Sequence, residues 1–160
     1  LQKNLDGILT VQDDELIVAF LDMVENHKMI VENSGLLTVA ALKHLDVKNK
    51  KIVSVLSGGN MDVITMSSVV QFGLIQRDRI FTVSVLLPDK PGELVRVSSV
   101  VAQKQGNVIK LDHNQFVSTN RNKAVELKIT MEAFGTEHKN EIVQALEEQG
   151  YKPRVIRANL

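Results

Sequence analysis

Residues 81–94, FTVSVLLPDKPGEL, decide the fold of the second half of this chain. Apolar side chains hold every second position of the first part, as in a half-buried β-strand: Phe81, Val83, Val85 and Leu87. Residues 88–92 then force a turn, because proline lacks an amide donor and glycine tolerates conformations closed to other residues. From Leu94 the apolar positions take helical spacing. The stretch therefore predicts a strand, a tight turn and a helix.

The rest of the second half extends this pattern. Residues 125–131 alternate most cleanly, with apolar and polar side chains on opposite faces. After the first helix, which ends near Gly106, we expect a strand at 108–117, a turn at 120–122, a strand at 125–131, a helix between Gly135 and Gly150 and a strand at 152–157. The order strand, helix, strand, strand, helix, strand is the ferredoxin-like α+β pattern, one antiparallel sheet with two helices on one face.

The first half has a different character. Helical spacing predicts helices at 13–27, 34–44 and 61–72. Between the last two, Ile52–Leu56 is an apolar, β-branched run typical of a parallel strand that is covered on both faces. The run ends in Ser57-Gly58-Gly59-Asn60. Helices around such a strand are α/β material, and because one strand cannot form a sheet, we expect its neighbours to lie outside this chain.

The period changes near 76–78, which predicts a boundary between residues 1–77 and residues 78–160. The sequence begins at Leu1, and the first recognisable element follows almost at once. We therefore expect the chain to begin within a domain of a longer protein.

Composition excludes several classes of function. Nineteen Lys plus Arg balance nineteen Asp plus Glu, so no net field attracts nucleic acid or an anionic membrane. No apolar run reaches the ~20 residues of a membrane helix. The absence of cysteine excludes disulfides and thiolate metal sites and fits a reducing compartment. We expect a soluble, cytoplasmic protein.

The turn also has the residues of a known ligand-binding motif. Asp89-Lys90-Pro91-Gly92-Glu93-Leu94 between a strand and a helix, with Gly106-Asn107-Val108 at the next strand, resembles the ACT domain. On physical grounds, exposed amides at a helix start suit a carboxylate, and Asp89 suits an ammonium group. The resemblance implies an effector site between two subunits, formed by residues 89–94 of one subunit, with Asn107 and Val108 supplied by the other.

The first half resembles the end of a threonine or serine dehydratase of the tryptophan-synthase-β type, pyridoxal-phosphate fold-type II. The resemblance rests on residues 31–35, on Lys51 to Asn60 and on the ACT unit that follows. It implies that the Ser57 hydroxyl hydrogen-bonds the pyridine nitrogen of pyridoxal phosphate, with Gly58, Gly59, Asn60 and Glu32 nearby, in the full-length enzyme. Asn33 and Ser34 depart from the commoner family residues.

No lysine here lies in a segment like the family's Schiff-base motif Ser-x-Lys-x-Arg-Gly, and the tetraglycine phosphate loop is missing. We therefore expect this chain neither to hold the cofactor tightly nor to catalyse. The resemblance implies a parent that deaminates threonine to 2-oxobutanoate and ammonia. This region would form a homodimer, or a tetramer in the parent, and bind an amino acid such as isoleucine or valine, or a nucleotide.

Two alternatives stay open. The chain could be a non-enzymatic amino-acid sensor, in which 57–60 is only a turn and residues 7–76 form an independent compact unit. RNA binding on a ferredoxin-like sheet needs exposed aromatic and basic side chains, whereas this chain has six aromatics and no net charge. We assign no metal site, because His27, His44 and His138 lack ligand-like spacing. Asp112 and His113, adjacent on a strand, point to opposite faces and suit a structural or interface role.

Overall fold

The computed structural model describes residues 4–114 and 125–158. The chain divides into two compact units, Leu1–Gly73 and Leu74–Leu160. The expected boundary after residue 77 falls slightly later, just beyond the helix α3 (Val63–Gln76). No helix among the described residues is long and apolar enough to cross a membrane.

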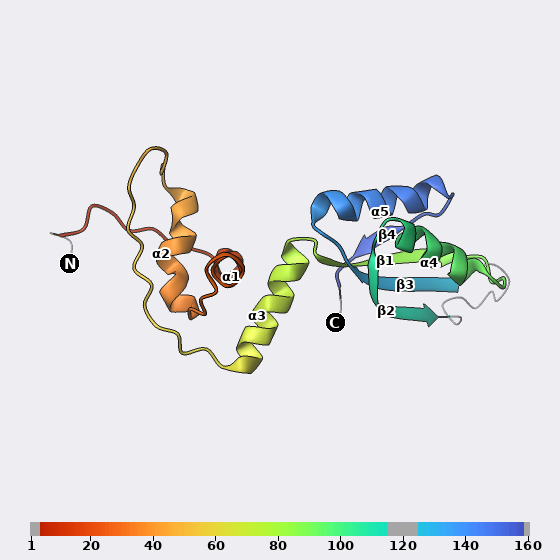
Figure 1. Ribbon diagram of the computed structural model, residues 1–160, viewed down its shortest axis with the longest axis horizontal. Coiled ribbons are helices and arrows are strands. Elements are labelled where there is room, and N and C mark those ends of the chain that lie inside the picture. The colour runs from red at the N-terminus through yellow and green to blue at the C-terminus, as the bar shows by residue number, and fades with distance from the viewer. Residues whose placement is uncertain (1–3, 115–124, 159–160) are drawn as a thin grey trace. The chain divides into compact units, whose positions relative to one another are not determined.

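Unit 2 has the expected ferredoxin-like topology (Figure 1). Its elements are β1 (Ile80–Leu87), α4 (Glu93–Gln103), β2 (Asn107–Asn114), β3 (Val125–Glu132), α5 (Thr136–Glu148) and β4 (Arg154–Ile156). The strands form one antiparallel sheet in the order β2-β3-β1-β4. The predicted order of strands and helices is confirmed. The predicted turn at 120–122, and the end of the strand expected at 108–117, lie outside the described residues.

The core of unit 2 lies between the sheet and its two helices. Alternate residues of the two central strands meet the inner faces of α4 and α5, and Figure 1 shows both helices on the same side of the sheet. The fully buried side chains are Val83, Val85, Val97, Val101, Leu127, Ile129, Met131, Ile142 and Leu146. Because strand side chains alternate, this burial fixes which residues face the helices and which face the opposite side.

Unit 1 is built from helices. They are α1 (Asp13–Asp22), which continues as the π-helical turn η2 (Met23–His27), then η3 (Asn33–Leu36), α2 (Leu37–Ala40) and η4 (Ala41–His44), and finally α3. The predicted helices at 13–27, 34–44 and 61–72 are thus confirmed within a few residues. Phe20 and Leu36 lie fully buried at the centre of the core of this unit.

The predicted strand at Ile52–Leu56 is wrong for this structure. The segment between η4 and α3 has no strand pairing, and Val53 and Val55 are 90% and 67% exposed. The physical reason is that a strand needs a neighbour to satisfy its backbone groups, and no strand lies in the described part of unit 1. The α/β architecture expected there is therefore not seen.

A buried charge pair secures the start of unit 2. Asp78 Oδ2 accepts a hydrogen bond of 2.8 Å from Thr136 Oγ1, and Asp78 Oδ1 lies 2.8 Å from Lys139 Nζ. Burial alone would raise the pKa of the Asp78 carboxyl, but these contacts with Lys139 and Thr136 outweigh it and hold the pKa below its ordinary value of 3.8. The carboxylate thus joins the chain before β1 to the first turn of α5.

We predict that Asp78→Asn lowers the unfolding free energy of unit 2 by about 1 kcal/mol at neutral pH. Because the folded-state pKa is depressed, the wild-type advantage is full above pH 3.8 and disappears as the pH falls through the folded value. Urea unfolding followed by Tyr151 fluorescence measures this, since Tyr151 is the one tyrosine and tryptophan is absent. An equal deficit at pH 7 and below pH 3 would contradict the assignment.

Candidate functional site

A hollow of about 320 Å³ opens beside the turn between β1 and α4. Its lining comes from the end of β1, the turn, the start of α4 and one residue of β2: Leu87, Pro88, Asp89, Lys90, Pro91, Gly92, Glu93, Leu94 and His113. Six of the eight residues predicted to bind an effector, 89–94, therefore surround one space.

Gly92 makes the backbone of this turn accessible. It has a φ of +92°, which favours glycine, and no atom lies within 4 Å of where a Cβ would stand. Gly92 is also the N-cap of α4 and has no side chain to cap the helix. The first-turn amides of α4 therefore face outward without a side-chain acceptor, and these groups and the helix dipole favour a carboxylate.

Glu93 is already engaged within the protein. Its Oε1 lies 3.2 Å from Arg96 Nη1, and its Oε2 accepts a 3.3 Å hydrogen bond from the Tyr151 hydroxyl. Burial, together with the negative charge of Glu93, raises the pKa of Tyr151 above its ordinary value of 10.0. Glu93 thus ties the start of α4 to the segment before β4. Of the acidic groups at the turn, Asp89 is the better candidate for a ligand contact.

The other two predicted effector residues lie elsewhere. Asn107 and Val108 begin β2, where Asn107 pairs with Glu132, whereas the turn follows the far end of β1. Asn107 Nδ2 donates a 2.9 Å hydrogen bond to Glu132 Oε2. Within one chain the structure therefore does not bring Asn107 and Val108 to the turn.

His113 lines the hollow and was not predicted there. It lies near the end of β2, opposite Leu127 of β3, which belongs to the core beneath the helices. Its neighbour Asp112 lies opposite Lys128 on the other face, as expected for adjacent strand residues. Placing His113 beside the turn requires the register between β2 and β3, which the local sequence pattern does not contain.

The predicted cofactor residues come together in unit 1. Glu32 accepts hydrogen bonds from Ser34 Oγ at 2.6 Å and from the Asn60 amide at 3.2 Å. Gly58 has a φ of +89°, and a Cβ there would lie 2.5 Å from Glu32 Oε1. The carboxylate thus packs directly against the turn at 57–60, where Ser57 is exposed.

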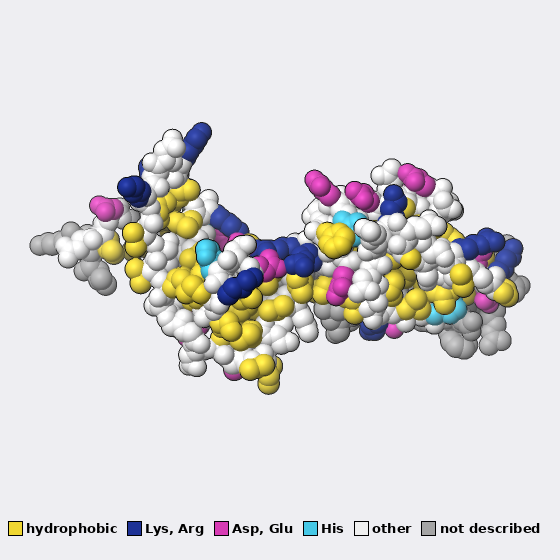
Figure 2. All heavy atoms as spheres, in the orientation of Figure 1, with side chains coloured by type: hydrophobic (Ala, Val, Ile, Leu, Met, Phe, Trp, Pro, Cys, Tyr) yellow, Lys and Arg dark blue, Asp and Glu magenta, His cyan; other side chains and the backbone are white. Residues whose placement is uncertain are grey.

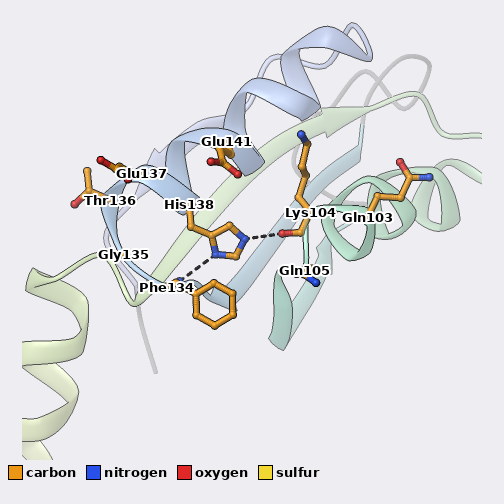
Figure 3. A pocket seen from close by; sticks show the side chains of 9 residues that line it. All are labelled: Gln103, Lys104, Gln105, Phe134, Gly135, Thr136, Glu137, His138 and Glu141. Atoms are coloured by element: carbon orange, nitrogen blue, oxygen red, sulfur yellow. Dashed lines mark hydrogen bonds between the residues drawn. The ribbon is translucent and has the colours of Figure 1, made fainter. Parts of the chain in front are cut away.

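A larger hollow lies where the end of α4 meets the start of α5 (Figure 3). His138 points into it, stacked on Phe134 with ring centroids 4.8 Å apart. The Phe134 amide donates to His138 Nδ1 at 3.0 Å, so the ring proton is on Nε2, which donates to the Lys104 carbonyl at 2.5 Å. Both ring nitrogens are therefore occupied in joining two elements of the fold.

Comparison with known proteins gives the chain relatives of one kind. It is 31% identical over 156 residues to the L-threonine ammonia-lyase of Thermotoga maritima, which covers 97% of the chain. It is 33% identical over 155 residues to the enzyme of the same name from Geobacter sulfurreducens, which covers 96%. The chain spans 39% of the length of each relative. The predicted resemblance to threonine dehydratases is confirmed.

Other comparisons add less. No protein-family model matches the chain. Among solved structures, the ACT domain of prephenate dehydrogenase from Bacillus anthracis covers 46% of this chain, and 99% of that chain is matched, at 22% identity and a TM-score of 0.36.

The contact between Glu93 and Tyr151 gives a direct test of the geometry at the turn. We predict that Glu93→Gln lowers the pKa of Tyr151, because the negative charge is lost, while burial keeps the pKa above 10.0. Ultraviolet titration of the phenol measures this without interference, since Tyr151 is the one tyrosine. Glu137→Gln is the control and should leave the titration unchanged. An unchanged titration in Glu93→Gln would show that the two side chains are apart.

Proposed function

We propose that this chain is the regulatory part of a threonine ammonia-lyase, an enzyme that deaminates threonine to 2-oxobutanoate and ammonia. The observation that carries this proposal is sequence similarity to two such enzymes along 97% and 96% of the chain. In this proposal unit 2 is an ACT domain that binds a small effector. Unit 1 is the end of the pyridoxal-phosphate catalytic domain.

The hollow at the β1–α4 turn offers complementary poles to a free α-amino acid. The outward amides of α4 and the open space at Gly92 suit its carboxylate, and Asp89 suits its ammonium group. Leu87 and Leu94 supply an apolar wall for a branched side chain such as that of isoleucine or valine. The volume of about 320 Å³ has room for a ligand of this size. A nucleotide is the other effector class that we consider.

Two copies complete the site in this proposal. The turn and Asn107 lie at opposite ends of the β2 edge of one chain. An antiparallel pairing of two β2 strands brings the start of one strand to the end of the other. Such a homodimer places Asn107 and Val108 of one copy beside the turn of the next. The effector then controls the enzyme through its different affinity for two arrangements of this interface, a coupling that is typically about 1–3 kcal/mol.

Unit 1 has the surface expected of a piece of a larger domain. Many of its large apolar side chains are exposed, and Figure 2 shows hydrophobic atoms gathered over its visible face. The most exposed are Ile8, Val53, Val55, Val63 and Ile64, at 81%, 90%, 67%, 77% and 81%. Contiguous apolar surface of this extent marks an interaction site in soluble proteins. We propose that the rest of the catalytic domain covers it.

The residues at the 57–60 turn fit one end of pyridoxal phosphate. Ser57 is exposed, and its hydroxyl can hydrogen-bond a pyridine nitrogen. Gly58 and Gly59 bring the backbone close, and Glu32 holds the turn from behind. Pyridoxal phosphate, when bound, supplies the electron sink for loss of the substrate's hydroxyl group. The lysine and the phosphate loop that this chemistry needs are not recognisable in the sequence, so we propose that this chain alone is inactive.

One observation favours a second candidate, a non-enzymatic amino-acid sensor. Unit 1 is compact, with its own core around Phe20 and Leu36. The exposed apolar surface argues against this candidate, because an independent unit would leave it uncovered. The whole polypeptide decides between the two. A catalytic lysine motif and a glycine-rich phosphate loop upstream would support the enzyme, and their absence there would support the sensor.

We predict that the chain binds one of a panel of branched-chain amino acids and adenine nucleotides in calorimetric titrations. Asp89→Ala and Asn107→Ala should each weaken this binding by about tenfold or more, because each removes a polar partner of the ligand. Asp46→Ala and Asn140→Ala are the matched controls, exposed residues away from the hollow, and should bind normally. Saturable binding that survives both Asp89→Ala and Asn107→Ala would contradict the site. No binding by any ligand would leave only a dimerisation role.

A further inference from the structure

The outer edge of β2 is an exposed apolar strand. The order β2-β3-β1-β4 places β2 at a sheet edge, and no described strand pairs with its outer side. Val108, Ile109 and Leu111 are 39%, 43% and 37% exposed. A long edge strand with exposed apolar side chains is a template for pairing with another chain.

Pairing with β3 assigns each residue of β2 to a face of the sheet. Leu111 and His113 lie on the face covered by the helices, and Lys110 and Asp112 lie on the opposite face. A register shift between Val108 and Lys110 marks a β-bulge, so Val108 returns to the helix-covered face. The regular part of the edge is therefore short and ends at this bulge.

Resting on the dimer proposed above, we propose that a second copy of this chain pairs antiparallel along β2 with its two-fold axis at Leu111. Directly opposed residues in an antiparallel pair share a face of the sheet. In a symmetric pair the axis must therefore place one residue opposite its own copy. With Leu111 at the axis, Lys110 of each chain lies opposite Asp112 of the other.

Charge complementarity selects this register. An axis at Lys110 would place two lysines opposite each other, and an axis at Asp112 would place two aspartates opposite each other, which is unfavourable. The axis at Leu111 opposes two apolar side chains and forms two Lys110–Asp112 pairs. Lys110 Nζ already lies 3.6 Å from Asp112 Oδ2 within the chain, so the dimer gives an alternating ring of four charges. Lys128, opposite Asp112 on β3, adds a further positive charge to this face.

The register also identifies what the second copy brings to the effector hollow. Beyond the bulge the alignment moves by one residue, so Val108 of the partner subunit falls opposite His113. His113 lines the hollow, and both positions are on the helix-covered face. Asn107 falls opposite Asn114, and its amide is turned to Glu132. The side chain that limits the size of the effector is therefore Val108 of the partner subunit.

Cysteine crosslinking tests the register on the whole 160-residue chain, which has no cysteine of its own. Leu111→Cys should form an intermolecular disulfide under mild oxidation, because directly opposed strand residues lie within the Cα separation of about 4.4–6.8 Å that a disulfide needs. His113→Cys alone should not crosslink, whereas a mixture of His113→Cys and Val108→Cys chains should. A monomeric wild type, or crosslinking of His113→Cys but not of Leu111→Cys, overturns the proposal.

Charge exchange gives an independent test by sedimentation equilibrium. Lys110→Glu and Asp112→Lys should each raise the dimer dissociation constant by about tenfold, because each places like charges opposite one another twice. Mixing the two variants should restore a dimer, since opposite charges then face each other at both pairs. Two variants that dimerise normally, or a mixture that stays monomeric, overturn the register. Neither test uses an effector, so failure of the sensing role leaves both outcomes readable.

Discussion

The burial of β1 and β3 beneath α4 and α5 is the constraint on which the rest of unit 2 depends. Val83, Val85, Leu127 and Ile129 are fully removed from solvent, so the central strands cannot slip by one residue without exposing their apolar faces. That register fixes where β1 ends and hence where the turn into α4 stands. The ligand-sized hollow is thus a consequence of core packing, because the turn residues only line a space that the strands have positioned.

The same packing leaves β2 as the strand with unmet requirements. Two helices cover the central strands, while β2 at the edge keeps apolar side chains partly exposed and its outer backbone groups unpaired by any described strand. The effector hollow has a comparable incompleteness, since the turn and Asn107 are separated by the length of the edge. One antiparallel contact between two copies would meet both requirements. This economy links dimerisation and sensing, because an effector between the copies would respond to their arrangement.

Unit 1 shows how a strand-like sequence behaves without a partner. Ile52–Leu56 has the composition of a buried parallel strand, yet it lies exposed beside the helices. The turn that follows is nevertheless ordered, because Glu32 accepts the Asn60 amide and packs against Gly58. Local polar contacts thus preserve the shape of the 57–60 turn, although the sheet that would present it to a cofactor is not formed within the described residues.

The sequence alone determined the order of elements in unit 2 and the location of the turn, because both depend on periodicity and on the backbone limits of proline and glycine. It also identified the helices of unit 1, the pair formed by Glu32 and the 57–60 turn, and the family resemblance. Only the tertiary structure decided that Ile52–Leu56 is not a strand here, that His113 lies at the turn and that Asn107 does not. Each of these depends on which segments meet across the chain. Local periodicity reports the face of a residue but not its neighbour, and that neighbour is set by strand register and by the presence of a partner.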